Sequence, residues 1–174
     1  MNKTLLSTAL VVVIAATAFA PTAQAANTGT ITISGKVLSD TCTVAVNGGA
    51  TVALPTVMTA SLGTVGATAG TTPFTVALTG CDTNTTTAAM SFSGSNIDAG
   101  TGNLKNTVVG GSNVQIQLLN GASLINASSG ANAPVINVTS GSGSVAMNAR
   151  YVAASAAATA GLVASTVNFT LSYQ

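Results

Sequence analysis

Two segments, one near each end of the chain, alternate between apolar and polar residues, and this alternation limits the fold more than any other feature. Near the N-terminus the residues that share one face are Gly29, Ile31, Ile33, Gly35 and Val37. Near the C-terminus they are Val163, Val167, Phe169, Leu171 and Tyr173. Successive side chains of a strand point to opposite faces of a sheet. Both segments are therefore predicted to be strands with one face built for burial.

The rest of the chain predicts short strands separated by turns, which is typical of an all-β sandwich. Asn47-Gly48 and Asn120-Gly121 are expected to form turns, because both residue types tolerate positive φ. We expect a connecting loop over residues 153–161 and an exposed loop over residues 95–112. Strands are expected over residues 28–46, 73–80, 88–92, 113–119, 135–138, 145–152 and 163–173.

The first 25 residues have the organisation of a cleaved secretory signal. Lys3 precedes an apolar run over residues 5–20, and Ala23-Gln24-Ala25 then offers the small residues that signal peptidase reads. A membrane-spanning helix is the alternative, but the run includes Ser and Thr and is shorter than the roughly 20 apolar residues that a span needs. Cleavage before Ala26 leaves 149 residues, which suits one domain.

Charged side chains are scarce, and this scarcity excludes several classes of function. The chain has four Lys and Arg residues, three Asp and Glu residues and no His. The common general bases and a Ser-His-Asp arrangement are therefore missing, and we predict no enzymatic activity, no metal and no cofactor. No basic cluster is present to bind nucleic acid. The exported chain is formally neutral, which favours association between copies because little charge repulsion keeps them apart.

The acidic residues are Asp40, Asp82 and Asp98. Each lies in or near a predicted turn, where Asp commonly bonds local backbone groups. A glycosidase generally needs a pair of carboxylates acting together. The turn interpretation therefore favours a local structural role for all three.

Cys42 and Cys81 both lie in the exported part of the chain. In an oxidising compartment such a pair indicates one disulfide, which would stabilise the fold by roughly 4 kcal/mol in the chain-entropy model. Two reduced, buried thiols are the alternative. Without His or a Cys-x-x-Cys spacing, a metal or redox role has little support.

The order of these features resembles that of chaperone–usher fimbrial subunits, specifically type 1-like major pilins. The most specific points are Gly80-Cys81 at the end of a predicted strand, Gly161 as the fourteenth residue from the C-terminus, and the penultimate Tyr173 in an alternating strand. The resemblance also covers residues 30–37, Cys42, residues 73–79, Ala160 and residues 167–174. The very low charge departs from the family, so surface contacts are not carried over.

The resemblance implies an incomplete immunoglobulin-like sandwich that lacks its final strand and is completed by a donor strand from another subunit. Residues 26–35 would form the donor-strand extension and residues 36–174 the pilin domain. The donor residues facing a neighbour's groove would be Gly29, Ile31, Ile33 and Gly35. The groove edge, which is also the chaperone recognition strand, would contain Gly161, Val167, Phe169, Leu171, Tyr173 and Gln174.

The implied function is that of a structural subunit that polymerises into a fimbria, a surface fibre used for cell adhesion. The implied partners are other copies of the chain, a periplasmic chaperone, an outer-membrane usher, and adaptor and tip adhesin subunits. The sequence leaves open a minor or adaptor pilin of the same system, a self-contained secreted β-sandwich binding module, and an amyloid-type fibre. The alternative for residues 26–35 is that they form an ordinary first strand of their own sheet.

Overall fold

The structure is a computed structural model that describes residues 31–37, 42–47 and 51–174. The chain divides into two units, Met1–Gly35 and Lys36–Gln174. Of the first unit, residues 31–35 are described, and they are exposed and lie in no strand. The predicted signal peptide and Gly29 lie outside the described residues.

The second unit is built from strands, with one short 3-10 helix among its described residues, η1 (Thr59–Leu62). Its strands are β1 (Thr43–Val46), β2 (Thr68–Thr79), β3 (Thr87–Ser93), β4 (Leu104–Lys105), β5 (Gln115–Asn120), β6 (Ser123–Ile125), β7 (Val135–Thr139), β8 (Ser142–Val152) and β9 (Asn168–Tyr173). The all-β class predicted from the sequence is therefore confirmed.

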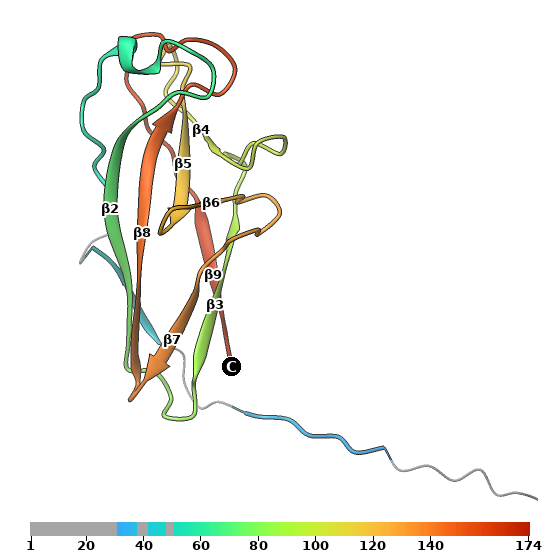
Figure 1. Cartoon of the computed structure of the whole chain (residues 1–174). Coiled ribbons are helices and arrows are strands. Elements are labelled where there is room, and N and C mark those ends of the chain that lie inside the picture. Colours follow the sequence, from blue (N-terminus) through green and yellow to red (C-terminus); the bar gives the residue numbers. More distant parts are fainter. Residues whose placement is uncertain (1–30, 38–41, 48–50) are drawn as a thin grey trace, which may run out of the picture. The chain divides into compact units, whose positions relative to one another are not determined.

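The strands form a sheet that curls around the main hydrophobic core (Figure 1), and a smaller cluster contains Leu62, Val114 and Ala153. The long strands β2 and β8 pair from Thr68↔Val152 to Leu78↔Gly143. On its other edge β8 pairs with β5 and, near its start, with β7. The path continues from β7 to β3 and from β3 to β9, so it runs β1-β2-β8-β7-β3-β9. Its two ends, β1 and β9, are each paired along one edge only among the described strands.

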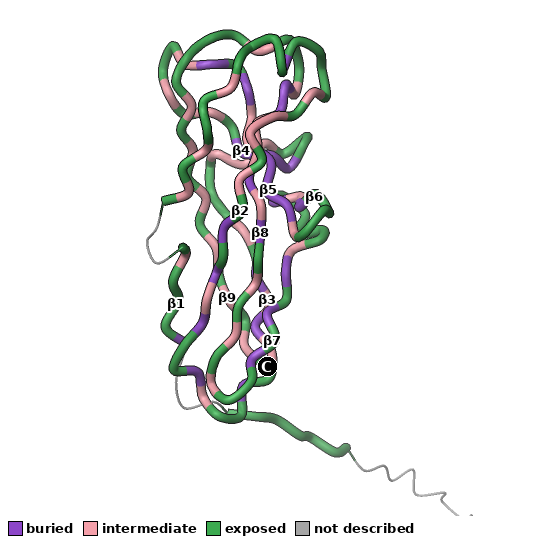
Figure 2. Tube along the Cα trace, turned by 60° about the vertical axis from the view of Figure 1, so that its left-hand side comes forward, coloured by how far each residue is buried: buried purple, intermediate pink, exposed green. Residues whose placement is uncertain are grey.

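Alternating side chains of these strands build the core. On β2 the inward residues Phe74, Val76 and Leu78 are buried, while the residues between them are more exposed. Met147 and Ala149 of β8 are buried against the same cluster. Figure 2 shows this alternation as buried and exposed stretches along the strands. Because apolar burial is the main stabilising term, this two-residue period fixes which face of each strand points inward.

Tight hairpins set the strand order at two places. The turn predicted at Asn120-Gly121 is present but shifted by one residue: its two loop residues are Gly121, with a φ of 59°, and Ala122, while Asn120 ends β5 by pairing with Ser123. Ser140 and Gly141 have φ values of 50° and 76° between β7 and β8. Positive φ at both central residues matches the right-handed twist of the flanking strands. Asn47 also has positive φ, in the turn that follows β1.

Several predicted boundaries are wrong. Residues 31–37 are not in a strand, and the strand near them is limited to β1, so the prediction over residues 28–46 fails for every described residue before Thr43. A strand needs a hydrogen-bonding partner, which alternation in one segment cannot supply. β9 begins at Asn168 rather than near Val163. The connecting loop over residues 153–161 is confirmed.

The predicted exposed loop over residues 95–112 is only partly exposed. It contains β4, which pairs with β5 through Leu104↔Ile116. Leu104 is buried in the core, and the Asn103 side chain donates to Gln115. The polar composition of this segment therefore serves internal hydrogen bonds as well as solvation.

Candidate functional site

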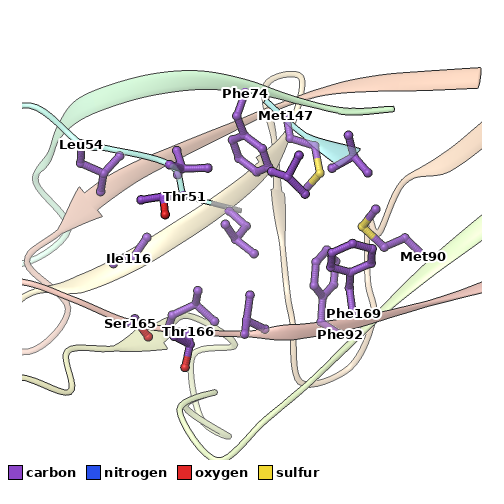
Figure 3. A pocket seen from close by; sticks show the side chains of 17 residues that line it. Thr51, Leu54, Phe74, Met90, Phe92, Ile116, Met147, Ser165, Thr166 and Phe169 are labelled. Atoms are coloured by element: carbon purple, nitrogen blue, oxygen red, sulfur yellow. The ribbon is translucent and has the colours of Figure 1, made fainter. Parts of the chain in front are cut away.

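An apolar groove lies between the two ends of the strand path. It has a volume of about 420 Å³, and both end strands contribute to it, β1 through Val46 and β9 through Phe169. The core strands form its floor. The side chains that line this floor include Phe74, Met90, Phe92, Leu104, Ile116, Leu118, Met147 and Ala149. In Figure 3 these side chains converge on the space between the walls, with Phe92 and Phe169 side by side. The groove thus opens directly onto the hydrophobic core.

One wall of the groove, which we call the β9 wall, consists of β9 and the residues before it, from Val163 to Tyr173. It presents an unpaired backbone to the groove. Gln174 and Thr87 exchange two hydrogen bonds, N–H to O at 2.9 Å and 3.2 Å. Such exchanging pairs alternate along an antiparallel ladder, so even-numbered residues of β9 bond β3. Phe169, Leu171 and Tyr173 direct their N–H and C=O groups away from β3, while their side chains pack on the core.

The same wall continues beyond β9 without a regular strand. The Ala164 carbonyl accepts bonds from the Thr107 N–H at 2.8 Å and the Thr107 hydroxyl at 3.0 Å. The Thr166 carbonyl accepts a bond from Asn96 Nδ2 at 3.1 Å. Burial also alternates from Val163 to Tyr173. The even-numbered residues therefore keep bonding one side, and the odd-numbered residues line the other for the whole length.

Asn106 holds the far end of this wall. Its side-chain amide donates to the carbonyls of Ser112 at 2.8 Å and Leu162 at 2.9 Å. Its Oδ1 accepts from the N–H groups of Val108 at 3.1 Å and Ala164 at 3.0 Å. One polar side chain thus replaces a stretch of backbone ladder.

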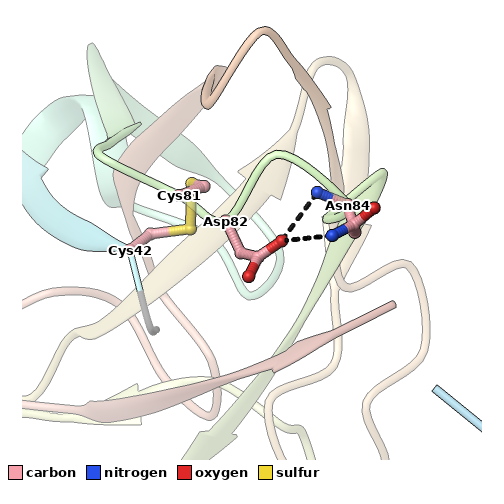
Figure 4. The surroundings of a disulfide bond; sticks show 4 residues. All are labelled: Cys42, Cys81, Asp82 and Asn84. Carbon is pink, nitrogen blue, oxygen red and sulfur yellow. Dashed lines mark hydrogen bonds between the residues drawn. A yellow bond between two sulfur atoms is a disulfide. The ribbon is translucent and has the colours of Figure 1, made fainter. Parts of the chain in front are cut away.

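The β1 wall is shorter and is held by the disulfide. β1 pairs with β2 through Thr43↔Thr79 to Val46↔Val76, and Val52 and Leu54 extend the wall beyond the turn. Cys42, directly before β1, is bonded to Cys81, directly after β2 and Gly80 (Figure 4). The predicted disulfide is therefore present, and it ties the start of this wall to the neighbouring strand.

No charged side chain lines the groove among the residues that the structure describes. The described acids bond local groups, as predicted: Asp82 Oδ1 accepts from the Asn84 N–H at 2.7 Å, and Asp98 Oδ1 accepts from the Gly100 and Thr101 N–H groups. The backbone and hydroxyl of Thr101 hold the pKa of the Asp98 carboxyl below its ordinary value. Asp40 lies outside the described residues. Across the described ranges, no three acidic or thiol side chains gather to hold a metal.

A second cavity, of about 490 Å³, contains Gly161 and Val163 in its lining. A Cβ on Gly161 would lie 2.5 Å from the Ser112 nitrogen, so the close passage of two backbones requires glycine there. Burial raises the pKa of the Tyr151 hydroxyl, which lines the same cavity.

The structure brings together part of the predicted site. Val167 and Phe169 line the groove, and Leu171 and Tyr173 pack on the same core. Gln174 is bonded to Thr87, and Gly161 lies in the second cavity. Ile31 and Ile33 are 87% and 90% exposed, and Gly35 is also exposed. Their predicted role as a donor strand stays a prediction.

Sequence reasoning missed the floor of the groove and the polar side chains of its wall. Met90 and Phe92 come from a segment predicted as a strand, but nothing local shows which strand faces the opening. Asn96, Asn106 and Thr107 were part of a predicted exposed loop. Ser165 was not singled out, although it is the polar exception on an otherwise apolar face.

The family described as "Fimbrial protein" matches residues 31–174 of the chain. The chain belongs to this family. It is 40% identical over 157 residues to the "F17 fimbrial protein" of Escherichia coli, a match that covers 84% of this chain and 87% of that protein. It is 38% identical over 134 residues to the "Type-1 fimbrial protein, A chain" of Escherichia coli, covering 68% and 72% of the two chains.

The fold of this fimbrial protein is that of pilus rod subunits. The crystal structure of the P pilus rod subunit PapA superposes with a TM-score of 0.62 at 18% identity, covering 76% of this chain and 99% of that one. The protein is thus a structural subunit of a fimbria, with an immunoglobulin-like fold that lacks its final strand. The described part of the chain contains no helix long and apolar enough to cross a membrane.

Proposed function

We propose that the groove accepts the segment 26–35 of another copy, and that repetition of this insertion builds the fimbria. The observation that carries the proposal is the position of the groove between the unpaired edges of β1 and β9. One further strand there would pair with both walls and join the two ends of the path. It would also cover the apolar floor, where burial is worth about 25 cal/mol per Å².

The donor segment matches the groove in chemistry. Ile31 and Ile33 share one face, and Gly29 and Gly35 flank them on that face. The side chains of Thr30, Thr32 and Ser34 would point to solvent. The isoleucines are almost fully exposed in the single chain, so insertion buries apolar surface on both partners. Strand addition of this kind obtains affinity from main-chain hydrogen bonds and specificity from alternate side chains.

The open groove also gives a reason for helper proteins. A free subunit exposes apolar floor and unpaired backbone, and both favour aggregation. In our proposal a periplasmic chaperone covers the groove until an outer-membrane usher passes the subunit to the growing fibre. Residues 1–25 act as the export signal, and the fibre reaches the cell surface, where adaptor and tip adhesin subunits complete it. The function is structural and assigns no catalytic role to any residue.

Single substitutions in residues 26–35, the donor arm, test the proposed strand exchange. Ile33→Asp places a charge on the face that enters the groove, and we expect loss of surface fibres by electron microscopy while export continues. Thr32→Asp, one residue away on the opposite face, is the matched control and should leave fibres intact. Normal fibres from Ile33→Asp would contradict the proposal. The same would follow from normal assembly after deletion of residues 26–35.

A self-contained binding module is the second candidate, because the domain has a cavity and a buried core of its own. Such a module would purify as a stable monomer without a helper protein. The proposed pilin instead requires a chaperone or a donor peptide to stay soluble.

A further inference from the structure

We propose that the hydroxyl of Ser165 is a hydrogen-bonding point for the inserted strand, and that it donates to the carbonyl of Gly35 of the incoming copy. This inference rests on the proposed strand exchange. It adds to that exchange a residue of the groove wall and a register.

Ser165 is placed as a polar contact in an apolar wall. It lines the groove (Figure 3), as Val167 does. Its Oγ is buried and has no hydrogen-bond partner among the described residues. A buried hydroxyl without a partner costs free energy. An incoming strand that supplies an acceptor would remove this cost, whereas the free subunit carries it.

The backbone on both sides of Ser165 is held by hydrogen bonds. Ala164 is bonded on one side to Asn106 and Thr107, and Thr166 is bonded to Asn96. These bonds all lead away from the groove. The N–H and C=O of Ser165 itself are therefore left to face the gap, as are those of the other odd-numbered residues of this wall.

The bond that we propose has counterparts in this domain. The N–H and the hydroxyl of Thr107 both donate to the Ala164 carbonyl, at 2.8 Å and 3.0 Å. Ser91 lies directly opposite Thr170, and its Oγ reaches the Thr170 carbonyl at 3.4 Å. A hydroxyl residue of one strand thus shares the carbonyl that faces its own N–H. In our proposal the Ser165 hydroxyl shares the Gly35 carbonyl of the inserted strand in the same way.

The register follows from the direction and the side-chain faces. The path from β1 to β9 has five antiparallel steps, so its two end strands run in opposite directions. An inserted strand is therefore antiparallel to one wall and parallel to the other, and we take β9 to be its antiparallel partner. Directly opposite residues share a face, so the odd-numbered donor residues meet the odd-numbered wall residues. A glycine opposite Ser165 lets the backbone approach the hydroxyl, because it has no Cβ. With Gly35 there, Ile33 lies opposite Val167 and Ile31 opposite Phe169.

Ser165→Ala separates this role from a general structural one. A labelled peptide of residues 26–37 is bound to the full exported chain at a concentration that keeps the chain monomeric. Its release is then followed after addition of excess unlabelled peptide. We expect release from Ser165→Ala to be roughly fivefold faster, the equivalent of one neutral hydrogen bond. At the same low concentration, and before peptide is added, the melting temperature of the variant should be unchanged or higher than that of the wild type, because a buried hydroxyl without a partner has been removed. Loss of a merely structural contact would instead lower it.

A second variant and a second peptide sharpen the test. Ser165→Thr keeps the hydroxyl and should release the peptide at nearly the wild-type rate. Ser172→Ala removes an exposed hydroxyl from the same wall and is the matched control. A peptide carrying Gly35→Ala should weaken binding to the wild-type chain more than to Ser165→Ala, because the two groups act on one contact.

Wild-type release rates from Ser165→Ala would overturn the assignment of Ser165 and leave strand exchange standing. Equal effects of Gly35→Ala on both chains would overturn the register. Failure of the wild-type chain to take up any peptide would instead contradict the proposed function itself.

Discussion

The two walls of the groove are held in different ways. The β1 wall contains a strand of four residues, Thr43–Val46, and a disulfide fixes its start. The β9 wall contains a strand of six residues, Asn168–Tyr173, and polar side chains from a loop hold its extension. A short strand with a free edge gains little from its few ladder bonds, so a covalent link secures it. A longer wall can rely on hydrogen bonds alone, provided that each one is made.

Removal of the disulfide is expected to have the largest effect. Cys42→Ser with Cys81→Ser should lower the free energy of unfolding by about 4 kcal/mol, because the cross-link constrains the unfolded chain. Denaturant unfolding with and without a reductant measures this loss. The reductant should destabilise the wild type and leave the double variant unchanged. An equal response of both proteins would show that the β1 wall does not depend on the link.

Truncation of an aromatic side chain in the other wall should cost less. Phe169→Ala removes a half-buried ring that packs against the core and lies opposite Phe92. We expect a loss of about 2–3 kcal/mol, below the value for a fully buried Phe, together with weaker binding of the donor peptide. Thr170→Ala, on the exposed face of the same strand, is the control for β9. A similar loss of unfolding free energy for both variants would mean that the groove face of β9 contributes no more to stability than its exposed face.

The side chain of Asn106, which clamps residues 162–166 to the neighbouring loop, should contribute less again to the free energy of unfolding. Asn106→Ala removes the side chain that bonds Ser112, Leu162, Val108 and Ala164. We expect a loss of about 1–2 kcal/mol, because the backbone groups that it leaves regain partners from water. Hydrogen exchange should increase at residues 162–166 but not within β9. Asn137→Ala, at an exposed position of β7, is the matched control. Unchanged exchange at residues 162–166 would contradict the clamp.

The smallest effect concerns Asp98, at the base of the same loop. The folded-state pKa of its carboxyl lies below the ordinary value of 3.8, chiefly because the Thr101 backbone N–H donates to the charged form. A lowered folded pKa stabilises the fold above the unfolded value, and this contribution is lost as pH falls through the folded value. Asp98→Ala should therefore lower the melting temperature slightly at neutral pH. The difference from wild type should shrink near pH 2; a difference independent of pH would exclude the charge as its cause.

Sequence patterns predicted the β9 wall better than the β1 wall. Alternation from Val163 to Tyr173 identified the inward residues correctly, even though the regular strand begins only at Asn168. The apolar residues of the other wall, Val46, Val52 and Leu54, are separated by a turn, so no continuous pattern joins them. The floor combines side chains from distant strands, and long-range pairing is not encoded in any local period.

The hydrogen bonds from Asn96, Asn106 and Thr107 to the β9 wall could not be predicted either, but for a different reason. Asn and Thr in a Gly-rich segment indicate a loop, but the same residues can face water or bond a neighbouring backbone. Only the position of residues 162–166 beside that loop decides between the two. The donor arm differs from these loop residues. Its alternation predicts a strand, but the partner that we propose for this strand belongs to another molecule.

The free edge of the β9 wall has a mechanical consequence. Hydrogen bonds of an antiparallel ladder lie perpendicular to the strands, and the wall offers them from Val163 to Tyr173. In the proposed fibre, tension along an inserted arm would act across these bonds in shear, so they share the load and must break together. Peeling from one end would load them one at a time and needs far less force. A joint without any covalent link can therefore resist pulling while each subunit remains a small, formally neutral domain.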